Sequence, residues 1–247
     1  MNSPSFIFAE NNREIRTDEV PFVKIVDMKD AGINYQRVNV GLADKGNSDL
    51  SARLLYEGSK LHELDEEYWK GSDIESYYIA KKTSRYVRQN IKLKSNERVI
   101  LNKEYFKIKP KLIWRQTASY PIAAFDNRGI WFGRSIQAGI IKHDQIDKFD
   151  YKYLLALLNS KYIRFLYSET VKESGRVFPQ VKLEKISNLP IKVISLSEQQ
   201  KYIQKVSEIL DITKSGDYSS NNEMKTKVSI ITEKIDNMVY KLSLIHI

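Results

Sequence analysis

The chain of 247 residues carries 40 lysine and arginine residues against 31 aspartate and glutamate residues, and it contains no cysteine. This length allows one large domain or two small ones, and the lack of cysteine excludes disulfides and thiolate metal sites. No stretch approaches the roughly 18 uninterrupted apolar residues of a membrane span, and the first ten residues do not resemble a signal peptide. The composition therefore predicts a soluble, cytoplasmic protein that does not act at a membrane.

The net charge of +9 is concentrated in one segment. Between Lys81 and Arg115 there are 12 basic residues and two acidic ones, Glu97 and Glu104. Such a run is often only a solvated face, but aromatic residues alternate with these cations, and DNA-binding surfaces combine phosphate neutralisation with flat groups. The aromatic residues are Tyr86, Tyr105, Phe106 and Trp114. An anionic membrane could attract the same charges, but the segment lacks an amphipathic helix with a basic face.

The first 60 residues show few clear signals. Residues 20–26 alternate as a strand does, and residues 35–40 are a second candidate strand. Residues 41–48 form a glycine-containing loop whose spacing fits neither the Walker nor the Rossmann pattern. We expect an N-terminal lobe, residues 1–60, whose polar loop could contact DNA phosphates.

A β-rich region follows a sharp turn at residues 69–74, where Gly71 is expected to adopt a backbone angle that other residues avoid. Residues 112–118 and 120–125 are predicted strands, and residues 126–129 form a turn with a glycine at its end. Residues 130–134 are expected to return as the partner strand and to continue through residue 141, which makes an antiparallel meander. Alternation places Arg115 and Thr117 on one face and Trp114 and Gln116 on the other.

Residues 151–167 predict one long helix that starts after Asp150 as its cap and covers a sheet. Its apolar stripe consists of Tyr151, Leu154, Leu155, Leu158, Tyr162, Phe165 and Leu166.

Two further helices are predicted near the end of the chain. Ser197 as cap and Gln200 at the third helical position indicate the start of the first helix, and residues 215–222 have the composition of a flexible linker. The second helix carries a heptad seam of Met224, Val228, Ile231, Ile235, Met238 and Leu242. The seam indicates either two antiparallel helices packed together or a docking surface for a partner subunit. Residues 242–247 resemble the translation of a sequencing-library adapter, so we expect a non-native tail there and a longer natural protein.

Several segments in order resemble the TaqI-like C-terminal specificity domain, the target-recognition part of adenine-N6 DNA methyltransferases and fused restriction-modification enzymes. The segments are Trp69-Lys-Gly-Ser-Asp-Ile74, Pro110-Lys-Leu-Ile-Trp-Arg-Gln-Thr117, the 151–167 helix, Phe178-Pro-Gln-Val-Lys182, Asn188-Leu-Pro-Ile191 and Leu196-Ser-Glu-Gln-Gln200. The resemblance covers about residues 60–241. It implies an α+β fold: a mixed, largely antiparallel β-rich recognition domain with a packed long helix, residues 1–192, followed by a C-terminal helical hairpin, residues 193–241.

The resemblance also implies sequence-specific binding of double-stranded DNA beside a methyltransferase domain or subunit. The chain itself has neither the Pro-Pro-aromatic loop that holds a flipped adenine nor a glycine-rich loop for the methyl donor. We therefore expect no enzyme activity from this chain alone and no cofactor in it. S-adenosylmethionine, and magnesium if a nuclease is associated, are expected only for the missing catalytic part.

Arginine and glutamine suit base reading, because Arg grips guanine and Gln grips adenine through two hydrogen bonds. On this basis the candidate base contacts are Arg115, Gln116, Arg128, Arg134, Gln137, Arg176, Gln180 and Lys182. The candidate phosphate contacts are Lys81, Lys82, Arg85, Arg88, Lys92 and Lys94. Gln180 and Lys182 lie in a motif shared by family members that read different sequences, which favours a structural role for them.

Three alternatives remain open. One is half of a type I specificity subunit, and another is a protein-interaction module whose basic patch is incidental. The third is an enzyme in its own right. Asp27-Met-Lys29 with Asp18 upstream has a nuclease-like spacing, although such a short pattern arises readily by chance. The histidines His62, His143 and His246 are scattered and predict no metal cluster.

Overall fold

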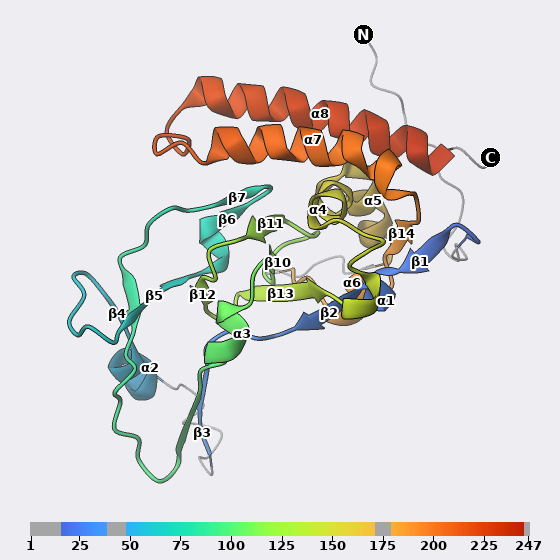
Figure 1. Cartoon of the computed structure of the whole chain (residues 1–247). Coiled ribbons are helices and arrows are strands. Elements are labelled where there is room, and N and C mark those ends of the chain that lie inside the picture. Colours follow the sequence, from blue (N-terminus) through green and yellow to red (C-terminus); the bar gives the residue numbers. More distant parts are fainter. Residues whose placement is uncertain (1–15, 39–47, 171–178, 245–247) are drawn as a thin grey trace.

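The computed structural model describes residues 16–38, 48–170 and 179–244. A central four-stranded sheet lies between a helical layer and a second sheet (Figure 1). The fold is α+β, as the sequence predicted. No helix within these ranges is both long and apolar enough to cross a membrane.

The central sheet has the order β11-β10-β13-β2, and every neighbouring pair is antiparallel. Its strands are β2 (Val26–Lys29), β10 (Lys111–Arg115), β11 (Ala123–Asp126) and β13 (Ile136–Ile141). Alternation along β10 sends Leu112 and Trp114 into the core under the helices and Ile113 into the core on the other side. Both faces of this sheet are therefore buried, and only its ends and edges reach solvent.

Four helices cover one face: α4 (Tyr151–Asn159), α5 (Lys161–Thr170), α7 (Leu196–Thr213) and α8 (Asn222–Leu244). Asp150 caps α4 as predicted, and its carboxylate accepts a hydrogen bond from the backbone N–H of Lys152 at 2.6 Å. The predicted single helix is broken at Ser160, however. The carboxylate of Asp236 in α8 accepts a hydrogen bond from the backbone N–H of Lys161 at 2.8 Å, so a side chain from another helix caps the start of α5.

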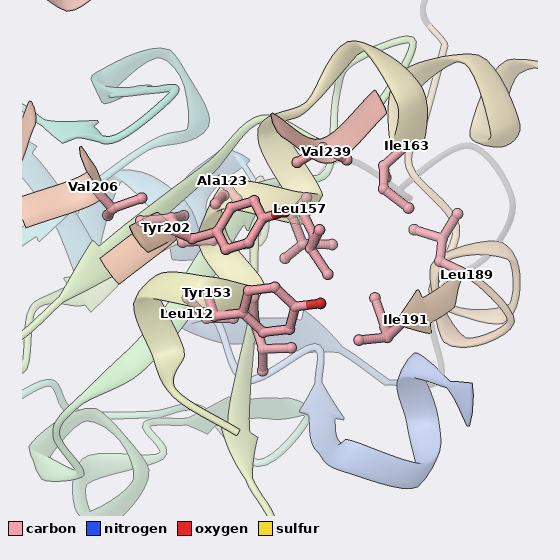
Figure 2. Packing of buried hydrophobic residues seen from close by; sticks show 14 of the residues in the cluster. Leu112, Ala123, Tyr153, Leu157, Ile163, Leu189, Ile191, Tyr202, Val206 and Val239 are labelled. Atoms are coloured by element: carbon pink, nitrogen blue, oxygen red, sulfur yellow. The ribbon is translucent and has the colours of Figure 1, made fainter. Parts of the chain in front are cut away.

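The helical layer and the sheet share one hydrophobic core (Figure 2). Tyr153 of α4 and Tyr202 of α7 meet edge to face, with ring centroids 5.3 Å apart. From α8, Val228 and Ile235 of the heptad seam are buried in the same cluster, and Met224 packs against it. The seam is thus occupied within the chain, in agreement with the predicted pair of antiparallel helices.

The cap of α7 and the connection to α8 differ from the prediction. Ser195 rather than Ser197 is the cap, and it forms a reciprocal capping box with Glu198. The expected flexible linker is a compact turn, in which Tyr218 is buried with its ring 4.9 Å from that of Tyr78. Aromatic packing therefore orders a segment whose composition is that of a linker.

The second sheet covers the other face and has the order β12-β5-β8-β4. Its strands are β4 (Leu55–Glu57), β5 (Glu66–Trp69), β8 (Arg85–Val87) and β12 (Trp131–Phe132). The turn between β11 and β12, with Gly129 at a φ of 77°, is as predicted. The meander is not, because β12 leaves the central sheet and pairs in parallel with β5.

A two-stranded ribbon of β3 (Asn34–Arg37) and β9 (Glu97–Ile100) lies beside α2 (Ser48–Leu54). The shorter elements are β1 (Glu19–Pro21), α1 (Phe22–Ile25), β6 (Ile74–Glu75), β7 (Tyr78–Ile79), α3 (Lys103–Lys107), α6 (Leu183–Ser187) and β14 (Pro190–Lys192), with 3-10 turns at Gly71–Asp73 and His143–Gln145.

Two N-terminal predictions need correction. Residues 20–26 are not one strand, because the four residues of α1 interrupt it. Gly71 does not adopt a positive φ. It is required for a close approach instead, since a Cβ there would lie 2.8 Å from the carbonyl oxygen of Ser135. Of the strand predicted at residues 35–40, residues 35–37 belong to β3. Residues 39–47, which include most of the predicted loop, lie outside the described residues.

Candidate nucleic-acid interface

A polar cleft of about 360 Å³ opens where β10 ends. Three segments that are distant in sequence surround it: residues 30–36, the end of β10, and the turn before β13. The lining residues are Asp30, Gly32, Asn34, Gln36, Gln116, Arg134 and Ile136. Gln116 and Arg134, two of the predicted base contacts, therefore lie together.

Backbone contacts hold the walls of this cleft. The backbone N–H of Ile33 donates to the carbonyl of Phe132 at 2.8 Å, and a parallel bridge joins Ile33 to Gly133. A Cβ on Gly32 would lie only 2.5 Å from the carbonyl oxygen of Gly133, so only glycine fits. Gln116 donates its backbone N–H to Ser135 at 2.9 Å. The Gln116 side chain thus projects from a fixed backbone.

Arg134 is exposed but held in place. Its guanidinium donates to the side-chain oxygen of Asn34 and, at 2.7 Å, to the carbonyl of Tyr35. The same group lies over the Tyr35 ring, 5.3 Å from the centroid. Because the guanidinium has five donors and these contacts use only one of its nitrogens, the others remain available to a ligand.

The lining offers the donors and acceptors that base edges require. Arginine suits guanine, glutamine and asparagine suit adenine, and a carboxylate such as Asp30 accepts from the amino group of cytosine. Among the described residues of the lining, Ile136 has the single apolar side chain. This composition fits a polar, flat ligand better than an apolar small molecule.

An antiparallel bridge joins Gln180 to Thr117, the residue after Gln116 of the cleft. The bridge places Gln180 and Lys182 near the cleft. Their backbone is held from below by the buried Tyr167, whose hydroxyl donates to the carbonyl of Gln180 and accepts the N–H of Lys182. The side chain of Gln180 is exposed. These residues lie beside the cleft, and the base contact stays a prediction. The Tyr167 contacts give the backbone of the motif a structural role.

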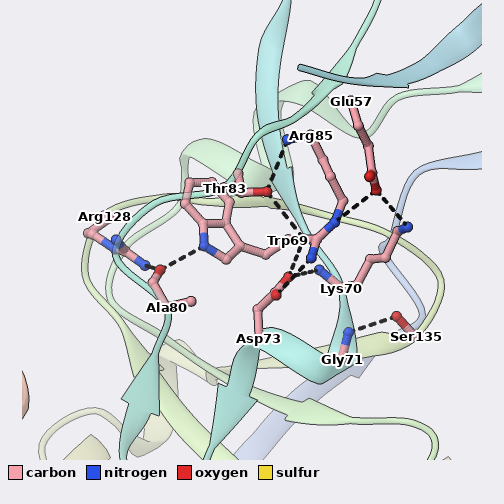
Figure 3. Close-up of polar contacts among 10 residues, drawn as sticks. All are labelled: Glu57, Trp69, Lys70, Gly71, Asp73, Ala80, Thr83, Arg85, Arg128 and Ser135. Atoms are coloured by element: carbon pink, nitrogen blue, oxygen red, sulfur yellow. Dashed lines mark hydrogen bonds and ion pairs between the residues drawn. The ribbon is translucent and has the colours of Figure 1, made fainter. Parts of the chain in front are cut away.

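Three other predicted base contacts have structural partners. Gln137 is buried, and its side-chain oxygen accepts the indole N–H of Trp114 at 2.8 Å, so it cannot reach DNA from this position. Arg115 donates through Nε to the carbonyl of Ile74. Arg128 donates to the carbonyl of Ala80 at 3.1 Å (Figure 3). It also donates to the carbonyl of Lys81 at 3.1 Å.

Arg128 is also partly desolvated. Its guanidinium lies 5.1 Å from the centroid of the Trp69 ring. Burial lowers the pKa of Arg128. Arg128 thus ties the turn between β11 and β12 to the second sheet, away from the cleft. Arg176 lies outside the described residues.

The predicted phosphate contacts fall into two groups. Arg85 is neutralised within the protein, since its guanidinium bonds both oxygens of Asp73 at 2.6 and 3.0 Å and also pairs with Glu57 (Figure 3). Lys94 pairs with Asp49 at 3.0 Å. The half-buried Arg88 lies over the Tyr56 ring. In contrast, Lys81, Lys82 and Lys92 are exposed and have no ion-pair partner among the described residues.

Sequence reasoning missed Asp30, Asn34 and Gln36. The alternating pattern of β3 was visible, but no local signal places that strand beside Arg134, about a hundred residues further along the chain. Within the described part of the chain, no group of three histidine or acidic side chains is placed to hold a metal ion.

The profile of a protein family described as TaqI-like C-terminal specificity domain matches residues 66–191, about half of the chain. No protein of curated function matches the chain.

Solved structures also resemble the fold. One, from work on assembly and conformational transition of a type I R-M system, has a TM-score of 0.44, with 13% identity over 93% of this chain and 48% of its own. The HsdS subunit from Thermoanaerobacter tengcongensis has a TM-score of 0.43, with 12% identity over 93% of this chain and 46% of its own. The type IIG restriction endonuclease BpuSI has a TM-score of 0.43, with 12% identity over 91% of this chain and 31% of its own. The chain thus spans less than half the length of each.

Proposed function

Because the chain belongs to the family of TaqI-like C-terminal specificity domains, we propose that it recognises a specific sequence of double-stranded DNA. The observation that carries this proposal is the polar cleft, where Gln116 and Arg134 meet Asn34 and Asp30. Every one of these side chains can form hydrogen bonds to a base edge, and three of them suit two-bond recognition, the arginine of guanine and the glutamine and asparagine of adenine. In this proposal the cleft residues read bases, and Gln180 and Lys182 approach the same DNA from the neighbouring segment.

The charge distribution supports DNA as the ligand. Exposed lysines that form no ion pair with a described residue, such as Lys81, Lys82 and Lys92, can neutralise phosphates and fix the orientation of the duplex. Arg85 and Lys94 contribute less, since carboxylates of the protein already neutralise them. The affinity should therefore fall with salt less steeply than the full count of basic residues would imply.

In the cell, the chain would act as the specificity part of a restriction-modification system. Its partner would be an adenine-N6 methyltransferase, either a separate chain or a domain of a longer protein. S-adenosylmethionine would bind that partner, and magnesium would serve only an associated nuclease. Pairing with a second recognition half, as in a type I specificity subunit, is a variant of the same proposal. The expected location is the cytoplasm, where the DNA lies.

The test is selection from a pool of random-sequence duplexes, followed by sequencing, at several salt concentrations. We expect enrichment of one short motif and an affinity that falls as salt rises. Retention of a random pool, or loss of all binding at about 0.15 M salt, would identify a nonspecific electrostatic binder and contradict the proposal.

The same preparation tests the assignment of catalysis to a partner. With labelled methyl donor and the enriched duplex, the chain alone is expected to transfer no methyl group, and with magnesium it should not nick plasmid DNA. Methyl transfer in a single turnover by the chain alone would show that it carries its own catalytic site.

A further inference from the structure

We propose that the ribbon of β3 and β9 enters the major groove, where Gln36 and Arg98 on its open face read neighbouring bases. This inference rests on the proposed DNA-recognition function and adds a second reading surface to the cleft. Asn34 and Gln36 lie outside the segment that matches the family, which starts at residue 66.

The register of the ribbon separates its residues into two faces. Gln36 lies opposite Arg98 and Asn34 lies opposite Ile100, whereas Tyr35 lies opposite Val99. Successive residues of a strand point to opposite faces, and directly opposed residues of an antiparallel pair share a face. One face therefore carries Gln36 with Arg98, and the other carries Tyr35 with Glu97.

Helix α2 covers the second of these faces. Ser51 donates its hydroxyl to the Tyr35 hydroxyl at 3.1 Å, and the guanidinium of Arg53 bonds the buried carboxylate of Glu97. The backbone N–H of Lys94 donates to the same carboxylate at 2.9 Å. The ribbon is thus fixed to the body of the protein by its closed face.

The other face is open. Gln36 and Arg98 are exposed, and half of the surface of Ile100 is accessible, at 50%. The Arg98 guanidinium has no hydrogen-bond or ion-pair partner in the described ranges. An arginine and a glutamine side by side can grip guanine and adenine, and an apolar side chain such as Ile100 can contact the thymine methyl group.

The open face continues into the cleft. Asn34 and Gln36 also line the cleft, and Asn34 accepts the guanidinium of Arg134. In Figure 1, β3 runs away from the central sheet toward the side opposite α7 and α8. The ribbon and the cleft therefore form one surface, with a protruding part and a recessed part.

DNA is the occupant that this surface fits. The major groove, about 12 Å wide, admits a two-stranded ribbon. Lys92 precedes β9 and Lys103 follows it, both exposed and without ion-pair partners in the described ranges, so cations flank the strand at both ends, where phosphates border a groove. An uncharged or basic protein partner would leave these cations and Arg98 without a counter-charge, whereas the phosphates of a duplex supply one at regular spacing.

The experiment repeats the duplex selection with Gln36→Ala, Arg98→Ala and Arg98→Lys. Lys225→Ala, which removes an exposed charge on α8, is the matched control. Each alanine variant should lose preference at one or two positions of the motif, on the order of ten- to a hundredfold, with the remaining positions unchanged. Arg98→Lys keeps the charge but loses the two-bond geometry, so it should retain affinity while its guanine preference falls. Lys225→Ala should select the motif of the unmodified chain.

Three results would contradict the inference. Identical motifs from all variants would overturn it. Uniform weakening by Arg98→Ala across all sequences, with a salt slope smaller by about 1, would show a phosphate contact instead. If the unmodified chain enriches no motif, the proposed function itself fails.

Circular dichroism and melting curves should be unchanged for the variants, because the side chains of Gln36 and Arg98 bond no described residue.

Discussion

At the scale of single residues, the most demanding feature is a buried ion pair. Lys111 Nζ lies 2.7 Å from Asp126 Oδ2, and both side chains are fully buried. The ammonium also donates to the carbonyls of Phe106 and Ile108, while the carboxylate accepts the backbone N–H groups of residues 128–130. Every polar atom of the pair is thus satisfied, which is the condition under which such a pair is tolerated.

Asp126→Ala is expected to lower the free energy of unfolding by about 3–5 kcal/mol, because it leaves an ammonium ion buried without a counter-charge. Urea denaturation measures the change. Lys107→Ala is the control: Lys107 pairs with Glu104 at the surface, so its loss should cost no more than about 1 kcal/mol. Equal effects of the two substitutions would mean that the buried pair is not formed.

Gly32→Ala tests the wall of the cleft. The new Cβ would meet the backbone of Gly133 at 2.5 Å and the backbone nitrogen of Arg134 at 2.9 Å, and neither can rotate away. We expect destabilisation of about 1–3 kcal/mol and weaker binding of the selected duplex, because Arg134 must shift. Gly216→Ala has no atom within 4 Å of its Cβ and should change neither the melting temperature nor the affinity. Normal binding by Gly32→Ala would show that the close approach is not needed.

At the scale of elements, the contact of the ribbon with α2 depends on pH. The hydrogen bond from Arg53, followed by that from the Lys94 backbone, lowers the pKa of Glu97 below its ordinary value of 4.5. A carboxylate with a lowered folded-state pKa stabilises the fold above its unfolded-state pKa, and this contribution is lost as pH falls through the folded-state value.

Glu97→Gln should therefore destabilise the protein at neutral pH, and its effect should shrink as the pH falls through the lowered folded-state pKa, because the native carboxyl then becomes protonated as well. The measurement is the free energy of unfolding against pH for both chains, with hydrogen exchange of residues 34–37 and 97–100 as the local readout. A difference that stays constant across this range would mean that the charge of Glu97 does not anchor the ribbon.

Elements with strong local signals were predictable. The start of α4 follows from Asp150, and the turn between β11 and β12 follows from Gly129. Structural features that depend on residues far away in the sequence were not predictable. The alternation of residues 130–134 is the same whether β12 pairs with β11 or with β5, so sequence favoured the nearer strand. The break at Ser160 depends on Asp236, which lies 75 residues beyond Lys161 in the chain.

At the scale of the whole molecule, the helical pair shares its core with the sheet. Ile235 of α8 is fully buried in the cluster that contains Trp114 and Leu112 of β10. Ile235→Ala should cost about 2–5 kcal/mol. Ile230, on the same helix but 50% exposed, serves as the control, and Ile230→Ala should stay within about 0.5 kcal/mol.

This substitution also tests cooperativity. Because the buried cluster is continuous, far-ultraviolet dichroism and tryptophan fluorescence should report one shared transition in the unmodified chain and in Ile235→Ala. An earlier, separate loss of helical signal would show that the pair unfolds as an independent unit.

Only part of the site was predictable, because the packing of the whole molecule decides which strand faces are buried. Periodicity assigns a side chain to a face of a strand, but it does not show what covers that face. Both faces of the central sheet are covered, so Gln137 is enclosed, whereas Gln116 and Arg134 lie where the strands end and remain accessible. The contribution of residues 30–36 depends on tertiary packing alone.

The division of the β3–β9 ribbon into a closed and an open face has a consequence for how target preference can diverge. Contacts that hold the ribbon use the side chains of Tyr35 and Glu97, while the side chains at positions 36 and 98 form no bond with the described part of the protein. Under the proposed DNA recognition, substitution at these two positions should therefore alter the bases that are preferred without loss of folding. A library randomised there, on an unchanged scaffold, should yield folded variants with new targets.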